Sequence, residues 1–186
     1  MATNQKEFRK QFWNQKKTVG AIAPSSRFLA KKMLQNIDFK NNKVIIELGP
    51  GTGVFTEEII SKMAPDAQLL VFEINDAFYH GLAGKIKDSR VHIIHDSAEK
   101  IEHYLQQYNL DKADVVVSSL PLAVFTPELR TGIISASKSA LHPHGKYIQF
   151  QYSLQAKSLL KKFYKRVNIS FTPFNFPPAF VYTCIK

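Results

Sequence analysis

The sequence predicts an α/β fold with a mostly parallel sheet and helices on both of its faces. Apolar runs typical of buried strands alternate with amphipathic segments through the middle of the chain. One of these runs ends in three alternating glycines, a pattern typical of a tight turn between a strand and a helix. Two strand-like segments close the chain without a helix between them, which indicates an antiparallel pair. With 186 residues the chain is long enough for one core, so we expect a single domain over residues 1–186.

The predicted elements follow one another in a regular order. Helices are expected over 5–15 and 26–35, the second with Ser25 as its N-cap. Alternation of strand and helix then predicts right-handed crossovers within a parallel sheet. The remaining segments are strand 44–48, helix 54–63, strand 69–74, helix 77–87, strand 91–95, helix 98–107, strand 114–118, helix 127–141, strand 146–151, helix 154–164, and strands 167–172 and 179–185. They give a seven-stranded sheet whose last strand is expected to run antiparallel.

Composition narrows the class of protein. The chain has 45% apolar and 22% charged residues, as globular proteins do, and one cysteine, Cys184. A single cysteine excludes an internal disulfide and a thiolate metal cluster, and it suits a reducing cytosol. The first ten residues are polar, so no signal peptide is expected, and the longest apolar stretch, 115–125, is too short to span a bilayer. We therefore expect a cytoplasmic protein without a metal site.

The net charge of +10 is unevenly distributed. The first seventeen residues contain five basic side chains and one acidic one, Glu7, and no acid follows Glu128. Such asymmetry favours a polyanionic partner, either nucleic acid or an anionic membrane surface. The alternative is a soluble protein with a generally basic surface.

The most specific motif is the turn after the first predicted strand. That strand holds one acid, Glu47, and Gly49, Gly51 and Gly53 follow it. A dinucleotide fingerprint, G-x-G-x-x-G, needs its third glycine at position 54, where this chain has Val54. A carboxylate before the turn would repel a pyrophosphate but attract a ligand that carries an amino group. The alternative is a plain strand-to-helix turn, in which a buried acid would be costly without a partner.

Polar side chains also end the next three strands. Glu73 follows the second, Asp96 the third, and Ser118 with Ser119 the fourth. The carboxyl ends of parallel strands share one edge of an open sheet, where ligands bind. A carboxylate about 20 residues beyond a glycine turn is placed to accept hydrogen bonds from ribose hydroxyls. Taken singly, Glu73 or Asp96 could equally be a helix N-cap or a solvated loop acid.

The stretch Glu47-Leu-Gly-Pro-Gly-Thr-Gly53 resembles the first motif of class I S-adenosylmethionine methyltransferases, E/D-x-G-x-G-x-G. The resemblance implies their Rossmann-like fold and S-adenosyl-L-methionine as cofactor, with S-adenosyl-L-homocysteine as product. It implies that Glu47 faces the methionine amino group, Glu73 the ribose, and Asp96 with Ser97 the adenine. The full set of implied cofactor-binding residues is Glu47, Gly49, Gly51, Gly53, Glu73, Ile74, Asp96, Ser97 and Ser118.

The methyl acceptor is expected at Ser118-Ser-Leu-Pro-Leu122. In the ribosomal RNA adenine dimethyltransferases the corresponding motif is N-[IL]-P-[YF], whose Asn holds the target amine and whose aromatic residue stacks on the base. Ser119 and Leu122 occupy these places here, and they are poorly suited to hold a flipped adenine. An RNA adenine methyltransferase is therefore the second hypothesis. A S-adenosylmethionine-binding protein without methyl transfer, acting as a sensor or adaptor, is the third.

Almost the whole chain more closely resembles the bacterial phospholipid N-methyltransferases, which methylate phosphatidylethanolamine. The stretches that carry the resemblance are Phe12-Trp13, Val19-Gly-Ala-Ile-Ala-Pro-Ser-Ser-Arg27, Ser118-Ser-Leu-Pro-Leu122 and Pro177-Pro-Ala-Phe-Val-Tyr182. The resemblance implies a phospholipid substrate and peripheral action at the inner face of a membrane, with nucleic acid a less favoured partner.

The candidate catalytic residues are Ser119 and Leu120, in the acceptor turn, and Tyr182. Tyr182 is one of several aromatic residues expected near the carboxyl ends of the strands, where a ring could hold an alkylated ammonium by cation–π attraction. The others are Phe125, Tyr152, Phe174 and Phe176.

Residues 1–36 predict a helical cover over the site. Phe8 and Phe12 share one face of the helix over 5–15, and basic residues surround them. This pattern is typical of a helix that lies in an anionic membrane interface. The alternative is a helix that packs both rings on the core. Arg27 is a candidate partner for a lipid phosphate.

Overall fold

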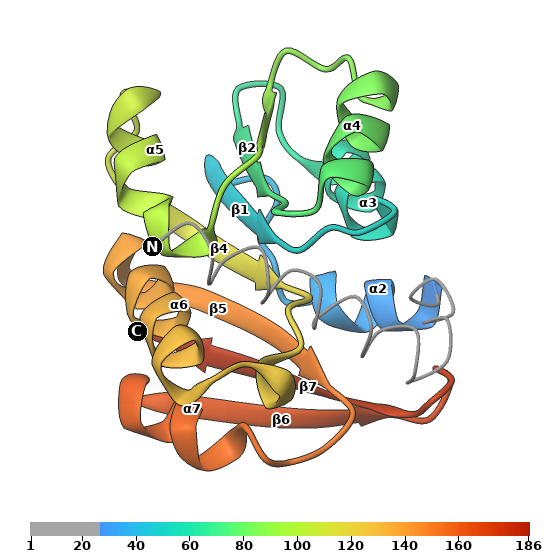
Figure 1. Ribbon diagram of the computed structural model, residues 1–186, viewed down its shortest axis with the longest axis vertical. Helices are drawn as coiled ribbons and strands as arrows, with labels where there is room; N and C mark the ends of the chain where they lie inside the picture. The colour runs from blue at the N-terminus through green and yellow to red at the C-terminus, as the bar shows by residue number, and fades with distance from the viewer. Residues whose placement is uncertain (1–26) are drawn as a thin grey trace.

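The computed structural model describes residues 27–186 and shows one seven-stranded sheet covered by helices on both faces (Figure 1). The helix predicted over 5–15 and most of the predicted cover over 1–36 lie outside the described residues. The strands are β1 (Val44–Leu48), β2 (Gln68–Phe72), β3 (Val91–Ile94), β4 (Ala113–Ser118), β5 (Leu141–Gln151), β6 (Arg166–Thr172) and β7 (Ala179–Ile185). The helices are α2 (Arg27–Leu34), α3 (Val54–Lys62), α4 (Asp76–Lys85), α5 (Ile101–Gln107), α6 (Pro127–Ala140) and α7 (Lys157–Phe163), with the 3₁₀ turns η1 (Ala98–Lys100) and η2 (Leu122–Val124).

The strand order, β3-β2-β1-β4-β5-β7-β6, puts the reversal of direction in a single strand. Strands β1 to β5 pair in parallel, and β7 runs antiparallel to both of its neighbours, β5 and β6. The antiparallel last strand is thus confirmed. The carboxyl ends of β1 to β6 and the loop from β6 to β7 consequently share one edge of the sheet, on the right in Figure 1, which we call the carboxyl edge.

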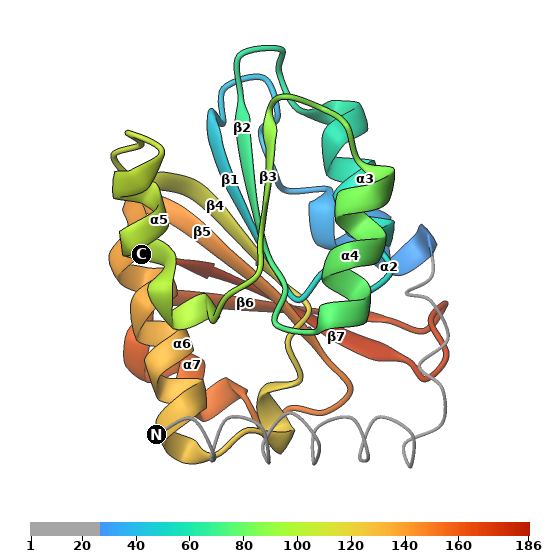
Figure 2. The same ribbon diagram turned by 45° about the horizontal axis from the view of Figure 1, so that its top comes forward.

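Alternation along the strands divides the core between the two faces. Figure 2 shows α5, α6 and α7 on one face and α2, α3 and α4 on the other. Ile46 of β1 packs in the first layer, with Ile101 and Ile134, whereas its neighbour Ile45 packs in the second, with Phe55. All five side chains are almost completely buried, and burial of each such side chain stabilises the fold by about 1.5–3 kcal/mol. The helices on both faces are therefore packed against the sheet by buried side chains, which fixes the positions of the strand ends.

Three predicted elements differ from the structure by more than a shift of one or two residues at an end. β5 begins at Leu141 instead of 146, because Leu141 pairs with Ala113 before the register shifts, and Pro143 and Gly145 lie within this irregular pairing. The helix predicted over 98–107 is divided into η1 and α5. α7 is shorter than 154–164, since residues 154–157 close a separate turn.

Candidate functional site

The glycine turn between β1 and α3 presents bare backbone at the carboxyl edge. Gly49, Gly51 and Gly53 all have positive φ, at 69°, 59° and 88°, a conformation that side chains with a Cβ rarely adopt. A Cβ on Gly49 would lie 2.7 Å from Leu120, and one on Gly53 would lie 2.6 Å from Leu82. A Cβ on Gly51 would meet nothing within 4 Å. Two of the glycines thus permit close packing, while the third borders open space.

Glu47 is a fully buried carboxylate at the end of β1. Neither of its oxygens has a hydrogen-bond partner among residues 27–186. Burial raises the pKa of Glu47 to about 8; the nearby Thr56 hydroxyl opposes the shift, and the negative charge of Glu73 adds to it. Removing a carboxylate from water without a partner is costly, so this residue is arranged for a cation that reaches it from the carboxyl edge.

Glu73 ties the end of β2 to the glycine turn. It is only 7% exposed, and its carboxylate accepts from the backbone N–H of Asn75 at 2.8 Å and of Gly51 at 3.3 Å. The N-cap of α4 is Asn75, which accepts from Phe78 N–H at 2.9 Å. Glu73 is therefore neither a helix cap nor a solvated loop acid. The next residue, Ile74, is partly buried, and its carbonyl lies 3.3 Å from the His95 ring.

Asp96 is held in a polar cluster at the end of β3. It accepts from Ser97 N–H at 2.7 Å, from Lys100 at 2.9 Å and from the Tyr104 hydroxyl at 3.1 Å. Burial by itself would raise the pKa of Asp96, but these donors outweigh it and lower the pKa. Ser97 caps η1 by accepting from Glu99 N–H. Both residues are thus ordered at the carboxyl edge, with Asp96 ionised.

The acceptor turn, residues 118–122, is fixed on both sides. Ser119 N–H donates to the Leu48 carbonyl of β1 at 2.9 Å, and the Leu120 side chain covers Gly49. Ser118 is fully buried, and its hydroxyl accepts from Leu120 N–H at 3.4 Å. The Ser119 hydroxyl oxygen is buried and has no hydrogen-bond partner in the described part of the chain. Leu122 is 1% exposed and belongs to the core.

Two glutamines at the end of β5, which the sequence analysis missed, hold the acceptor turn. Gln149 and Gln151 each donate from Nε2 to the Leu120 carbonyl at 2.9 Å. Gln149 also accepts from the buried Tyr147 hydroxyl at 2.7 Å, and the Tyr147 ring stacks on Tyr164 with centroids 5.4 Å apart. The available signal was a pair of alternating amides at the carboxyl end of an otherwise apolar strand, on one face of the sheet.

Tyr182 stands in register with Gln149 on the neighbouring strand. Its ring is fully buried, its hydroxyl donates to the Ser153 carbonyl at 3.0 Å, and burial raises its pKa. The ring therefore packs inside the molecule and is not presented to a headgroup; its contact secures the connection between β5 and α7.

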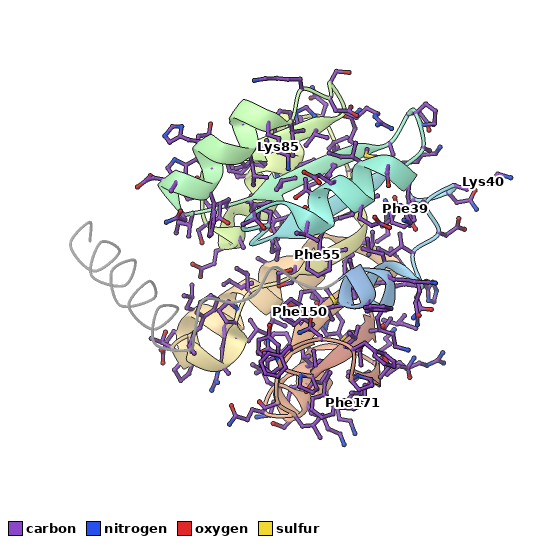
Figure 3. All side chains as sticks on the ribbon, turned by 90° about the vertical axis from the view of Figure 1, so that its right-hand side faces the viewer. Phe39, Lys40, Phe55, Lys85, Phe150 and Phe171 are labelled. Carbon is purple, nitrogen blue, oxygen red and sulfur yellow. The ribbon has the colours of Figure 1, made fainter. Side chains whose placement is uncertain are left out.

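The other candidate aromatic residues differ widely in exposure. Phe125 is buried, Tyr152 is 36% exposed, and Phe174 and Phe176 are largely exposed. A row of rings runs from Phe55 through Phe150 to Tyr152, with centroids 6.2 Å and 5.6 Å apart. Figure 3 looks onto the carboxyl edge and shows Phe55 and Phe150 near its middle.

Residues 27–186 bring no three His, Cys, Asp or Glu side chains together as a metal site requires. None of the helices within these residues has the length and apolar character needed to cross a bilayer.

Comparison with known proteins places this site in a family. The family model described as Ribosomal RNA adenine dimethylase matches residues 3–149. The chain belongs to this family. Among relatives, the ornithine lipid N-methyltransferase of Singulisphaera acidiphila is 30% identical over 176 residues, which cover 94% of this chain and 92% of that protein. The ribosomal RNA small subunit methyltransferase A of Thermotoga neapolitana is 28% identical over 112 residues, and the match spans 40% of its length.

Solved structures agree with the fold of this methyltransferase. The precorrin-6y C5,15-methyltransferase of Geobacter metallireducens superposes with a TM-score of 0.68 at 15% identity, covering 89% of this chain and 94% of that one. The N-methyltransferase NodS of Bradyrhizobium japonicum, in complex with S-adenosyl-L-homocysteine, gives a TM-score of 0.66 at 10% identity and covers 87% and 88%. The predicted Rossmann-like methyltransferase fold is confirmed, as is the predicted kinship with lipid N-methyltransferases.

The cofactor of this methyltransferase is S-adenosyl-L-methionine, and the residues present fit it. The unpartnered carboxylate of Glu47 would hold the amino group, and the open backbone at Gly51 would border the ligand. Glu73 would accept hydrogen bonds from the ribose hydroxyls, and Asp96 with Ser97 would border the adenine. When bound, the cofactor supplies an electrophilic methyl group on a sulfonium.

Proposed function

We propose that this methyltransferase methylates the primary amine of a membrane lipid headgroup, with phosphatidylethanolamine as the first candidate substrate. The observation that carries the proposal is the burial of Leu122. The resembled adenine dimethyltransferases use an aromatic residue at this position to stack on the target base. A side chain that is aliphatic and 1% exposed cannot form such a platform. A small amine needs no stacking surface.

The proposed partner of the amine is the Ser119 hydroxyl in the acceptor turn. A carbonyl oxygen has two lone pairs, and the Leu120 carbonyl already accepts from Gln149 and Gln151. The Ser119 hydroxyl, buried and without a partner among the described residues, is left to accept a hydrogen bond from the substrate amine. A headgroup ammonium must lose a proton to solvent water before it attacks the methyl group. The neutral amine then donates an N–H to the Ser119 hydroxyl oxygen, which favours the orientation in which the nitrogen lone pair faces the methyl group.

Ornithine lipid is the second candidate substrate, because a relative that matches nearly the whole chain is an ornithine lipid N-methyltransferase. Both lipids present a primary amine at the membrane surface. We propose further that the protein is cytoplasmic and acts peripherally at the inner membrane face, where its net charge of +10 would favour anionic lipids.

The test is methyl transfer from labelled S-adenosylmethionine by the full chain. Vesicles containing phosphatidylethanolamine, vesicles containing ornithine lipid, and small-subunit ribosomal RNA are offered separately. Label in a lipid is expected, and Ser119→Ala should lower its rate at least tenfold without weakening cofactor binding. Label only in RNA would support the dimethyltransferase hypothesis instead. Cofactor binding without any labelled product would support the non-catalytic hypothesis.

A further inference from the structure

The large hydrophobic side chains that the described residues leave exposed gather at one edge of the sheet. We call them the apolar rim: Phe28, Val124, Tyr152, Leu154, Phe171, Phe174 and Phe176. Single exposed hydrophobic residues are ordinary on a protein surface, but a contiguous group marks an interaction site. Apart from Phe28 of α2, every member lies at or after the carboxyl end of a strand.

The members of the rim lie at the same edge of the sheet as the acceptor turn. The Phe28 ring lies 5.6 Å from that of Phe174, which connects α2 to the loop between β6 and β7. Phe171, near the end of β6, packs on Phe180 at 5.2 Å and lies on the β6 side of the edge in Figure 3. Tyr152 and Leu154 follow β5, and Val124 lies in η2, directly after the turn that holds Ser119. The rim therefore borders the place where a substrate would enter.

The loop over 173–178 holds its rings outward. Phe174 is 70% and Phe176 88% exposed, whereas Asn175 between them is 7% exposed and donates from Nδ2 to the Pro177 carbonyl at 2.7 Å. Three prolines, at 173, 177 and 178, further restrict this segment. Two of the most exposed rings of the molecule are thus displayed by an anchored loop.

Charge around the rim favours an anionic lipid surface over other occupants. Lys31 and Lys32 follow Phe28 on α2, and Lys157 follows Leu154. No acidic residue occurs after Glu128, so every charged side chain in β5, β6 and β7 is basic. Aromatic rings beside lysines are typical of the bilayer interface, where the rings enter the headgroup layer and the lysines meet anionic headgroups.

We propose that the apolar rim docks this protein on an anionic lipid bilayer, with Phe174 and Phe176 inserted among the headgroups. The inference rests on the proposed function, which it deepens: a docked rim turns the acceptor turn toward the membrane. A lipid amine then reaches Ser119 while its acyl chains stay in the bilayer. Docking is thereby assigned to the β6–β7 loop and its neighbours, in addition to any contribution of the N-terminal segment.

The experiment measures binding of the full chain to vesicles of phosphatidylethanolamine and phosphatidylglycerol by flotation. The double variant Phe174→Ser/Phe176→Ser should bind roughly tenfold to a hundredfold more weakly, because two apolar rings are lost. The matched control Phe174→Leu/Phe176→Leu, which keeps apolar side chains, should retain most of the binding. Both variants should keep the cofactor affinity of the wild type, which shows that they are folded.

A second measurement locates the inserted residue. A Phe176→Trp variant in a Trp13→Phe background should show a blue-shifted emission on vesicles, whereas Lys87→Trp, just before β3 at the opposite edge, should not. Vesicle binding that is unchanged in the serine variant would overturn the proposal, as would rim-dependent binding to RNA without binding to vesicles. Rim-dependent vesicle binding without lipid methylation would leave the docking surface standing and refute the proposed function.

Discussion

The side-chain amide of Gln149 donates to the carbonyl of Leu120 at 2.9 Å, across the gap between β5 and the acceptor turn. Gln151 donates to the same oxygen at the same distance. The turn is thus held by a strand whose sequence shows no recognised motif. Gln149 is fully buried and itself accepts from the Tyr147 hydroxyl. A substitution at either residue is therefore expected to displace the acceptor turn that contains Ser119.

Replacement of Gln149 by Leu should uncouple methyl transfer from cofactor binding. The variant removes the acceptor of the Tyr147 hydroxyl and one donor to the Leu120 carbonyl, at a cost of about 1–3 kcal/mol in the free energy of unfolding. We expect kcat to fall at least tenfold while the Kd for S-adenosylmethionine changes less than twofold. Gln106→Leu, on the exposed side of α5, is the control. A Kd that weakens in step with kcat would contradict a role confined to the acceptor turn.

Replacement of Glu47 by Gln should make the cofactor-free protein more stable at neutral pH. The folded pKa of Glu47, about 8, lies above its ordinary value of 4.5, so the folded state holds a proton that the unfolded state releases. Stability of the wild type is therefore lost as the pH rises from about 4.5 to 8. Chemical denaturation should show the wild type losing on the order of 3 kcal/mol relative to the variant between pH 5 and pH 8.

The same variant should bind S-adenosylmethionine poorly, since it cannot supply a negative charge to the amino group. Glu58→Gln, a change of an exposed acid paired with Lys62, is the control and should alter neither property. If the free energy of unfolding of Glu47→Gln and of the wild type changed in parallel between pH 5 and pH 8, Glu47 would be ionised throughout that range and would have an undetected partner.

Alanine at Gly51 should weaken cofactor binding more than it weakens the fold. Its positive φ makes a Cβ unfavourable by about 1–2 kcal/mol, but that Cβ meets no atom of the protein and enters the space assigned to the ligand. We expect calorimetry to show at least a tenfold weaker Kd. Gly84→Ala, inside α4 with nothing within 4 Å of its Cβ, should leave binding unchanged and raise stability by about 0.5–1 kcal/mol. Equal losses of binding in both variants would be inconsistent with a cradle at Gly51.

Neutralising Glu73 should weaken both the binding of S-adenosylmethionine and the hydrogen bonds that Glu73 accepts from Gly51 and Asn75. Glu73→Gln weakens the acceptors that hold Gly51 and Asn75, and it places an amide where a ribose hydroxyl would donate. The expected result is a Kd for S-adenosylmethionine roughly tenfold to a hundredfold weaker, measured by equilibrium binding. Glu57→Gln, an exposed acid on α3 paired with Lys85, serves as control. Unchanged affinity would remove Glu73 from the predicted cofactor site.

The order of elements was predictable because hydrophobic periodicity and turn-forming residues are local features of the sequence. Strands and helices from 44 to 140 lie within a few residues of their predicted bounds, and the three-glycine turn located the cofactor site. The start of β5 was not predictable, since Pro143 and Gly145 indicate a turn and only pairing with Ala113 extends the strand. That pairing joins residues far apart in the chain, and a local sequence pattern holds no information about it.

Side-chain partners within the site were predictable only where a motif fixes them. Glu47 follows from its place before the glycines, but Gln149 and Gln151 acquire their role from β5 lying beside the acceptor turn. Lys100 and Tyr104 are four residues apart and share one face of the helix predicted over 98–107, so their joint contact with Asp96 could have been anticipated. Exposure of Phe174 and Phe176 depends on how the loop is anchored, and their hydrophobicity alone indicated core packing equally well.

The reversal of β7 has an evolutionary consequence. It brings the hairpin loop over 173–178 to the same edge as the cofactor turn, although the two are encoded at opposite ends of the described chain. Substitutions or insertions in that loop can alter the surface to which the enzyme docks while the register of every parallel strand is preserved. Membrane docking and cofactor binding would therefore rest on separate stretches of the chain, and the docking loop could change without altering the residues around the glycine turn.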